Sequence, residues 1–103
     1  MRELVPPPAA REDANSTEVL RSWIANGAQW CSLNPHIYRN QSFAEEWAWG
    51  LFLSDTVRHL ARAISQESGK DSEKVKKEIR KAFLKEIKRP TSAVRGGFFE
   101  GEP

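Results

Sequence analysis

The sequence predicts an α+β fold in which a β-hairpin packs against two antiparallel helices. An Asn-Gly pair at residues 26–27 lies between two short apolar segments, and this dipeptide is the strongest short-range signal for a hairpin. Apolar residues then recur at helical spacing over residues 42–67 and 71–89. Because the link between these two segments is short, the two helices are expected to run antiparallel.

The length and composition of the chain are those of one globular domain. It has 103 residues, of which 39% are apolar and 29% are charged. The expected organisation is an extended N-terminal arm over residues 1–16, a single α+β domain over residues 17–90 and a C-terminal tail over residues 91–103. No apolar run approaches the roughly 20 residues that a membrane-spanning helix needs.

Two features predict a cytoplasmic location. The N-terminal segment MRELVPPPAARED lacks the apolar core that a secretory signal requires. Cys31 is the single cysteine, so an intramolecular disulfide is excluded. In the arm itself, the prolines at residues 6–8 exclude a helix interior and favour an extended path. Leu4 and Val5, just before them, could add an edge strand to the hairpin.

Residues 17–35 are open to two interpretations. In a hairpin about residues 26–27, Trp23 lies opposite Trp30 on one face. The opposite face is the expected core face, and its apolar residues are Leu20, Ile24, Cys31 and Leu33. The alternative is a short helix over residues 17–26, with Asn15 and Glu18 as a capping box and Gly27 at its end. The hairpin is favoured because residues 30–33 need a strand partner.

The start and end of each helix are expected from capping signals. Ser42 with Glu45 forms a capping box for the long helix, and Ser68-Gly69 ends it. Its apolar stripe consists of Trp49, Phe52, Leu53, Thr56, Val57, Leu60 and Ile64. Asp71 or Ser72 caps the second helix and Pro90 closes it. Its stripe consists of Val75, Ile79, Phe83 and Ile87. The tail is expected to be ordered only if Phe98 and Phe99 dock.

The segments LRSWIANG, CSLNP, WGLFLSDTVRHLARA and KRPT resemble a small bacterial family known as domain of unknown function 5076. The positions that carry the resemblance are Leu20, Arg21, Trp23, Ile24, Gly27, Ser32, Leu33, Pro35, Trp49, Gly50, Leu53, Asp55, Arg58, His59, Ala61, Pro90 and Thr91. It covers roughly residues 4–92. The connector PHIYRNQSFAEE, the lysine-rich last helix and the tail RGGFFEGEP depart from the family pattern. The resemblance implies the hairpin-plus-helices layout and no particular activity.

A cluster of polar residues on the long helix is the first candidate site. Spacings of three and four place Asp55 beside Arg58 and His59, with Arg62 one turn further. An aspartate beside a histidine can raise its basicity, so Asp55 and His59 are candidate catalytic residues. Arg58 and Arg62 are candidate anion-binding residues. The favoured interpretation is nevertheless structural, either an intrahelical ion pair or a buried polar contact that ties the helix to the hairpin or the tail, because the sequence places no nucleophile or glycine-rich phosphate loop.

No metal site or cofactor is predicted. The imidazole and thiol groups of the chain belong to His36, His59 and Cys31, and none of them are paired at the spacing of metal ligands. Cys31 is interpreted as a small core residue.

A row of lysines on the second helix is the other candidate site. Residues 70–89 carry nine lysines and arginines against four acids, a net charge of +5. The row consists of Lys70, Lys74, Lys77, Lys81, Lys85 and Lys88, on the face away from Val75. Such a row could bind a polyanion in a salt-dependent way. A solvated face is favoured, because Glu73, Glu78 and Glu86 flank the lysines and no aromatic residue lies among them.

These observations favour a non-catalytic interaction or accessory protein. Two helices cannot cover both faces of the hairpin, so Trp23 and Trp30 are expected to lie in a homodimer interface. The first alternative is a polyanion-binding or nucleic-acid-binding module that uses the basic segment 70–89. The second is a small enzyme or ligand binder centred on Asp55 and His59. A further, unidentified protein partner is compatible with the first hypothesis.

Overall fold

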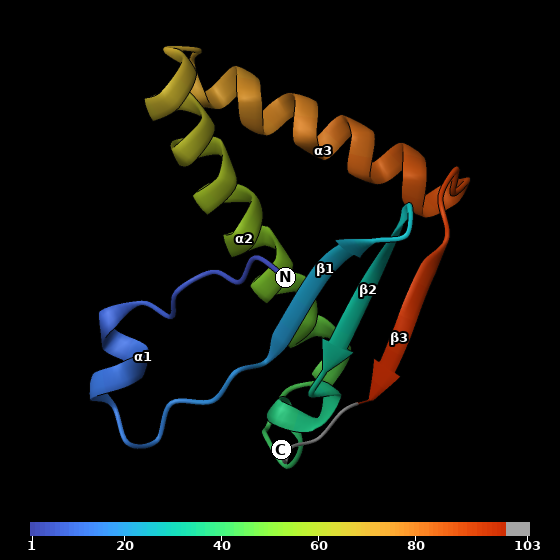
Figure 1. Cartoon of the computed structure of the whole chain (residues 1–103). Helices are drawn as coiled ribbons and strands as arrows, with labels where there is room; N and C mark the ends of the chain where they lie inside the picture. Colours follow the sequence, from blue (N-terminus) through green and yellow to red (C-terminus); the bar gives the residue numbers. More distant parts are fainter. Residues whose placement is uncertain (99–103) are drawn as a thin grey trace. The chain divides into compact units, whose positions relative to one another are not determined.

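The computed structural model describes residues 1–98 of the chain, coloured in sequence order in Figure 1. The elements are α1 Pro8–Glu12, β1 Leu20–Ala25, β2 Ala28–Leu33, a 3-10 turn at Pro35–Tyr38, α2 Glu45–Ser68, α3 Ser72–Lys88 and β3 Val94–Phe98. They form two compact units. One holds residues 1–37 and 94–98, with the sheet, and the other holds residues 38–93, with α2 and α3. A single domain over residues 17–90 stays a prediction.

The predicted hairpin is confirmed and the alternative helix over residues 17–26 is wrong. β1 and β2 pair antiparallel in the expected register, with Leu20 opposite Leu33 and Trp23 opposite Trp30. Asn26 and Gly27 have φ values of 51° and 72°. This is the left-handed region that both central residues of a type I′ turn require, and Asn and Gly are the residues that enter it most readily.

A third strand comes from the segment expected to be a tail. β3 pairs parallel with β2, from Gln29 opposite Val94 to Leu33 opposite Phe98, which gives the strand order β1-β2-β3. The sequence VRGGF has little strand propensity because of its two glycines. Its partner is more than 60 residues away in the chain, so no local pattern predicts the pairing. The docking of Phe98 and Phe99, on which an ordered tail was expected to depend, involves Phe99, which lies outside the described residues.

The N-terminal arm contains a short helix rather than an entirely extended path. α1 begins with Pro8 at its first position, where a proline is tolerated because the missing N–H would have no partner within the helix. Residues 1–7 have no regular secondary structure, so Leu4 and Val5 do not form the added edge strand. These two side chains are 95% and 74% exposed.

The start of α2 differs from the prediction, whereas its end agrees. The helix begins at Glu45 with Ala44 as N-cap and without a side-chain capping bond, so the capping box of Ser42 and Glu45 is wrong. Glu45 and Glu46 in the first turn instead complement the positive end of the helix dipole. At the other end, Gly69 has φ 77° and its N–H donates to the Ser65 carbonyl. This is the expected glycine C-cap.

Both ends of α3 lie where the sequence predicts them. The Asp71 side chain accepts a hydrogen bond from the Lys74 backbone N–H at 3.1 Å, so Asp71 rather than Ser72 is the N-cap. The helix ends at Lys88, two residues before Pro90, and Lys85 and Lys88 lie in its last turn. Cations there complement the negative end of the dipole.

α2 and α3 run antiparallel and diverge from the turn that joins them (Figure 1). Both helices carry apolar residues in rows of i, i+4, namely 53, 57, 61 on α2 and 75, 79, 83, 87 on α3. Packing one such row into the other favours a crossing angle of about 50°, which separates the helices away from their contact. Ala61 and Val75 are 3% and 9% exposed, whereas Phe83 and Ile87 further along α3 are 43% and 66% exposed.

The described residues contain a very small core. The buried apolar residues are Ala48, Ala61 and Val75, and no large side chain among the described residues is fully buried. Within the same residues, no helix is long and apolar enough to cross a membrane. The small core leaves the largest apolar side chains of the helices in contact with solvent.

Candidate functional site

The polar cluster on α2 joins Asp55 to Arg58 rather than to His59. The Asp55 carboxylate and the Arg58 guanidinium form an ion pair, and their side chains are 57% and 56% exposed. His59 and Arg62 are also exposed on the helix. No hydrogen bond links Asp55 to His59 in residues 1–98, and neither residue lines the pocket described below. The geometry is that of the surface ion pair favoured by the sequence.

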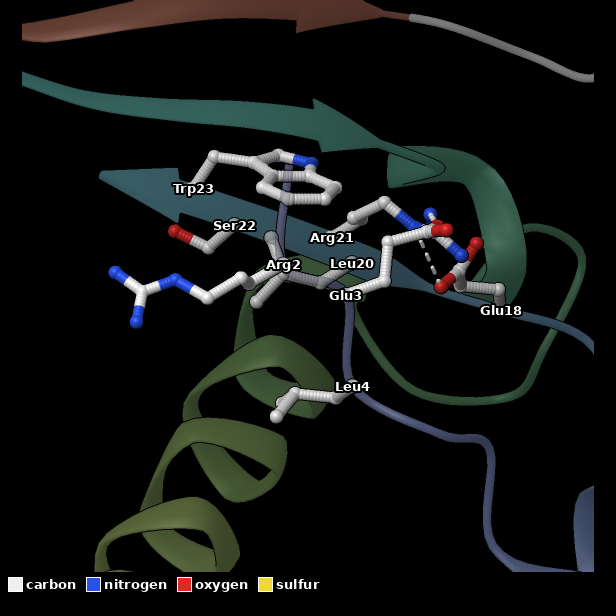
Figure 2. A pocket seen from close by; sticks show the side chains of 8 residues that line it. All are labelled: Arg2, Glu3, Leu4, Glu18, Leu20, Arg21, Ser22 and Trp23. Atoms are coloured by element: carbon white, nitrogen blue, oxygen red, sulfur yellow. Dashed lines mark hydrogen bonds and ion pairs between the residues drawn. The ribbon is translucent and has the colours of Figure 1, made fainter. Parts of the chain in front are cut away.

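A small pocket lies in the unit that contains the sheet (Figure 2). Its volume is about 170 Å³, and its lining residues are Arg2, Glu3, Leu4, Glu18, Leu20, Arg21, Ser22 and Trp23. Pockets that bind organic ligands usually measure about 300–1,000 Å³. This one is below that range and is close in volume to an engineered cavity of about 150 Å³ that binds benzene.

Three charged residues that line this pocket, Glu3, Glu18 and Arg21, form a cluster. Figure 2 shows the Arg21 guanidinium between two carboxylates, 3.0 Å from Glu18 Oε2 and 2.6 Å from Glu3 Oε2. The hydrogen bond to Glu18 is the main cause that raises the pKa of Arg21, followed by the bond to Glu3. Because two carboxylates already surround this cation, it is poorly placed to bind a further anion. This cluster was not predicted from the sequence, because Glu3 and Arg21 are 18 residues apart and no local pattern links them.

Cys31 belongs to a polar group on one face of the sheet. Its thiol is 3.4 Å from the Ser22 hydroxyl and 3.6 Å from the Gln29 amide nitrogen, and that amide also donates to Ser22 at 3.0 Å. Cys31 is half-buried, and Ile24 on the same face is 83% exposed. The face expected to form the core is therefore partly polar and partly open. Among residues 1–98, no group of three histidines, cysteines and acids is placed to hold a metal.

Trp23 and Trp30 face each other across the hairpin, as expected. Trp23 is half-buried and also lines the pocket. Trp30 is 37% exposed, and its indole N–H donates to the Ala25 carbonyl at 2.7 Å. The pair thus presents only a modest apolar surface, and its place in an interface stays a prediction.

The lysine row continues along the whole exposed face of α3. Its helical members are Lys74, Lys77, Lys81, Lys85 and Lys88, and all five are exposed. Lys70 precedes the helix. In the described part of the chain, no ion pair involves these lysines, whereas Lys76, on another side of α3, pairs with Glu73 at 3.0 Å. The row is thus a basic surface whose lysines form no ion pairs within the described residues.

An exposed apolar row at the N-terminal end of α2 was not predicted from the sequence; Phe43 lies just before the helix, and Trp47 and Leu51 lie on it. Phe43, Trp47 and Leu51 are 41%, 61% and 49% exposed, and the rings of Phe43 and Trp47 are 6.2 Å apart. At 3.6 residues per turn, Trp47 and Leu51 lie about 140° and about 180° around the helix from the centre of the predicted stripe. We call these three residues the outer row. The run WAWGLFL at residues 47–53, apolar on every side of the helix, was the signal that could have revealed it.

The neighbouring aromatic residues of α2 are differently placed. Trp49 packs edge-on against Phe52, with ring centroids 5.2 Å apart, and against Tyr38 at 5.7 Å. Trp49 and Phe52 are half-buried. Only one side of the apolar run is therefore partly covered, and the outer row is left on the other side.

The chain matches the model of one protein family over residues 3–91. It belongs to the family described as Domain of unknown function (DUF5076). The predicted resemblance is confirmed, and the match to DUF5076 includes Glu3 and Arg21 but ends before β3.

A comparison of this DUF5076 member with curated proteins gives no significant match. Among solved structures it is similar to one from the photosynthetic bacterium Rhodopseudomonas palustrus CGA009, described as a "putative pyruvate dehydrogenase". The two are 25% identical, with a TM-score of 0.65. The match covers 100% of this chain and 97% of the other, so the two chains are of similar length.

Proposed function

We propose that this DUF5076 protein is a non-catalytic interaction protein that associates with itself through the outer row of α2. The single observation that carries the proposal is the exposure of Trp47. A helical segment that is apolar on all sides is normally buried on all sides, yet Trp47, the first residue of the apolar run 47–53 in α2, is 61% exposed.

The small core is a second argument for association. Ordering a chain of this length costs on the order of 100 kcal/mol of conformational entropy, which burial of apolar surface must offset. Three small or medium side chains are buried among the described residues, whereas fifteen large apolar side chains remain exposed. Burial of the outer row between two protomers supplies part of the missing apolar contact.

A second copy of the chain suits this surface better than a highly charged partner. The ion pair of Asp55 with Arg58 follows Leu51 by one to two turns on the same side of α2. Toward the C-terminus of α2, the border of the outer row thus carries one charge of each sign and is neutral. A two-fold interface places a surface against itself, so a neutral border avoids the repulsion that a singly charged border would cause.

The proposal excludes an active site at Asp55 and His59. Asp55 is engaged by Arg58, and no pocket described in this structure lies beside His59. The activity named for the Rhodopseudomonas protein is therefore not proposed for this chain. The bacterial source of that structure and the single cysteine support a bacterial, cytoplasmic setting for the proposed function.

Sedimentation velocity tests the proposal. We expect the wild-type chain, whose protomer mass is 11.7 kDa, to sediment as a dimer at tens of micromolar. The double variant Trp47→Glu, Leu51→Glu should sediment as a monomer, because it places four buried charges in the paired interface. A wild-type chain that sediments as a monomer at 100 μM would overturn the proposal.

The matched control adds the same charge elsewhere on α2. Ala63→Glu with Gln66→Glu introduces two carboxylates at exposed positions far along the helix from the outer row. This variant should stay dimeric, and its circular dichroism and that of the first variant should match the wild type. Equal dissociation of both double variants would show that net charge, not the outer row, controls association, and would contradict the proposed surface.

A further inference from the structure

We propose that the lysine row of α3 binds duplex nucleic acid through its phosphate backbone, without reading sequence. The row, defined here as Lys74, Lys77, Lys81, Lys85 and Lys88, is exposed at every member. At 100° per residue the five side chains fall within about 80° of arc, and at 1.5 Å per residue they span about 21 Å. One strand of B-DNA presents about six phosphates over that length.

The acids that flank the row are mostly engaged with other groups. Glu86 accepts hydrogen bonds from the Thr91 backbone N–H and hydroxyl, both at 2.9 Å. Glu73 pairs with Lys76, which lies outside the row. α3 contains three acids that could neutralise the row. Among the described residues, Glu78 is the one of these three that has neither an ion-pair nor a hydrogen-bond partner for its side chain. The surface therefore keeps most of its positive charge.

The pKa of Glu86 supports the same assignment. The Thr91 backbone N–H is the largest cause that lowers it, the Thr91 hydroxyl is the second, and Lys85 is only a minor one. The carboxylate is stabilised mainly by Thr91, so Lys85 is left to interact with a partner.

The composition of the row favours a duplex over a single strand. Proteins that bind single strands without sequence preference use aromatic side chains on which the bases stack. No aromatic residue lies within the arc of the row, and its lysines are point charges that suit phosphate contacts. Bases inside a duplex need no stacking partner from the protein.

An anionic membrane fits the row less well. A helix that lies on a membrane inserts apolar side chains next to its basic ones. On α3, Val75 and Ile79 lie on the face opposite the row and are buried or half-buried. Leu84, 48% exposed, borders the row, whereas Ile87 and Phe83, 66% and 43% exposed, lie about 80° and about 120° of arc beyond that edge. One leucine provides little insertion, so the surface is better suited to a purely electrostatic partner.

The number of phosphate contacts sets a measurable salt dependence. Each contact contributes about −0.9 to the slope of log affinity against log salt, so five contacts give about −4.5. Affinity should therefore fall roughly 500-fold between 50 and 200 mM salt. This slope is the quantity that the test measures.

Fluorescence anisotropy with a labelled 20-base-pair DNA duplex tests the proposal on the full-length chain. In the triple variant Lys77→Gln, Lys81→Gln, Lys85→Gln the slope should become shallower, from about −4.5 to about −2, because three contacts are removed. The matched control, Arg2→Gln, Arg11→Gln, Arg39→Gln, removes the same net charge at exposed positions outside α2 and α3 and should keep the wild-type slope. Circular dichroism checks that both variants remain folded.

Three outcomes would overturn the proposal. The first is the absence of salt-sensitive binding to the duplex at 50 mM salt. The second is an equal loss of slope in the two triple variants, which would show a response to net charge alone. The third is tighter binding to a 20-nucleotide single strand, or to vesicles of phosphatidylcholine and phosphatidylglycerol at 3:1, than to the duplex. None of these measurements depends on self-association through the outer row.

Discussion

Gly27 and Gly50 differ in backbone conformation. Gly27 sits in the hairpin turn with φ 72°, where an L side chain is strained whatever the space around it. Gly50 lies inside α2 in ordinary helical conformation. A Cβ built on either residue meets no atom within 4 Å. The two positions therefore differ in backbone conformation and not in the space available for a Cβ atom.

The same substitution at these two glycines should have opposite effects. Gly27→Ala is expected to lower the free energy of unfolding by about 1–2 kcal/mol, because alanine disfavours the left-handed region. Gly50→Ala is expected to raise it by about 0.5–1 kcal/mol, because alanine loses less backbone entropy in a helix. Urea unfolding of both variants measures this. A stabilised Gly27→Ala variant would contradict the turn geometry.

The contact of Glu86 with Thr91 predicts a pH dependence. The pKa of Glu86 is lowered below its ordinary value of 4.5 by the Thr91 backbone N–H and hydroxyl. The folded state thus binds this proton more weakly than the unfolded state. The contact stabilises the fold above pH 4.5, and this stabilisation is lost as the pH falls through the folded pKa.

Removal of the Thr91 hydroxyl should raise the pKa of Glu86 part of the way toward its ordinary value. Thr91→Val deletes the hydroxyl donor and keeps the backbone N–H, so the rise should be incomplete. An NMR titration of the Glu86 carboxyl carbon measures it. The control is Thr56→Val, whose hydroxyl donates to the Phe52 carbonyl within α2 and contacts no carboxylate. An unchanged titration in Thr91→Val would contradict the contact.

The two long helices differ in how local signals define their ends. α3 has a side-chain cap from Asp71 and a proline two residues after its end, so short-range chemistry fixes both limits. α2 ends at Gly69 in the same local way, but it begins after Ala44 without a side-chain cap. The capping box that Ser42 and Glu45 suggest does not form, because the helix begins at Glu45 itself.

Alanine substitutions at Asp71 and Ser42 should distinguish the N-cap that forms at α3 from the capping box that does not form at α2. Asp71→Ala is expected to lower the free energy of unfolding by about 1 kcal/mol, because the Lys74 N–H loses its acceptor. Ser42→Ala is expected to change it by less than about 0.5 kcal/mol, as for an ordinary surface position. Chemical unfolding at pH 7 measures both values. A larger effect of Ser42→Ala than of Asp71→Ala would contradict the described caps.

At the scale of the whole molecule, residues 1–98 bury little apolar surface. Ala48, Ala61 and Val75 are the buried apolar residues among residues 1–98, and Trp47 is 61% exposed. If two protomers bury the outer row, stability depends on protomer concentration, because dimerisation favours the folded state by mass action. The thermal midpoint of the wild type should therefore rise with concentration, whereas that of the Trp47→Glu, Leu51→Glu variant should not. A wild-type midpoint independent of concentration would count against self-association.

Local sequence determined the hairpin and most helix limits of this protein. Asn26-Gly27 sets the turn because few residues enter the left-handed region, and Gly69, Asp71 and Pro90 act on backbone groups within a few residues. The polar cluster of α2 and the lysine row were equally predictable, since side chains three or four residues apart on a helix are neighbours.

Tertiary structure alone decided the third strand, the Glu3–Arg21 contact and the exposure of the outer row. Strand pairing between residues 29–33 and 94–98, like the ion pair at the pocket, joins segments far apart in the chain, so no local spacing encodes it. Periodicity shows which side of a helix is apolar, but only packing decides which apolar side is covered. The run at residues 47–53 is apolar on every side, and the structure shows that Trp47 and Leu51 lie on the uncovered one.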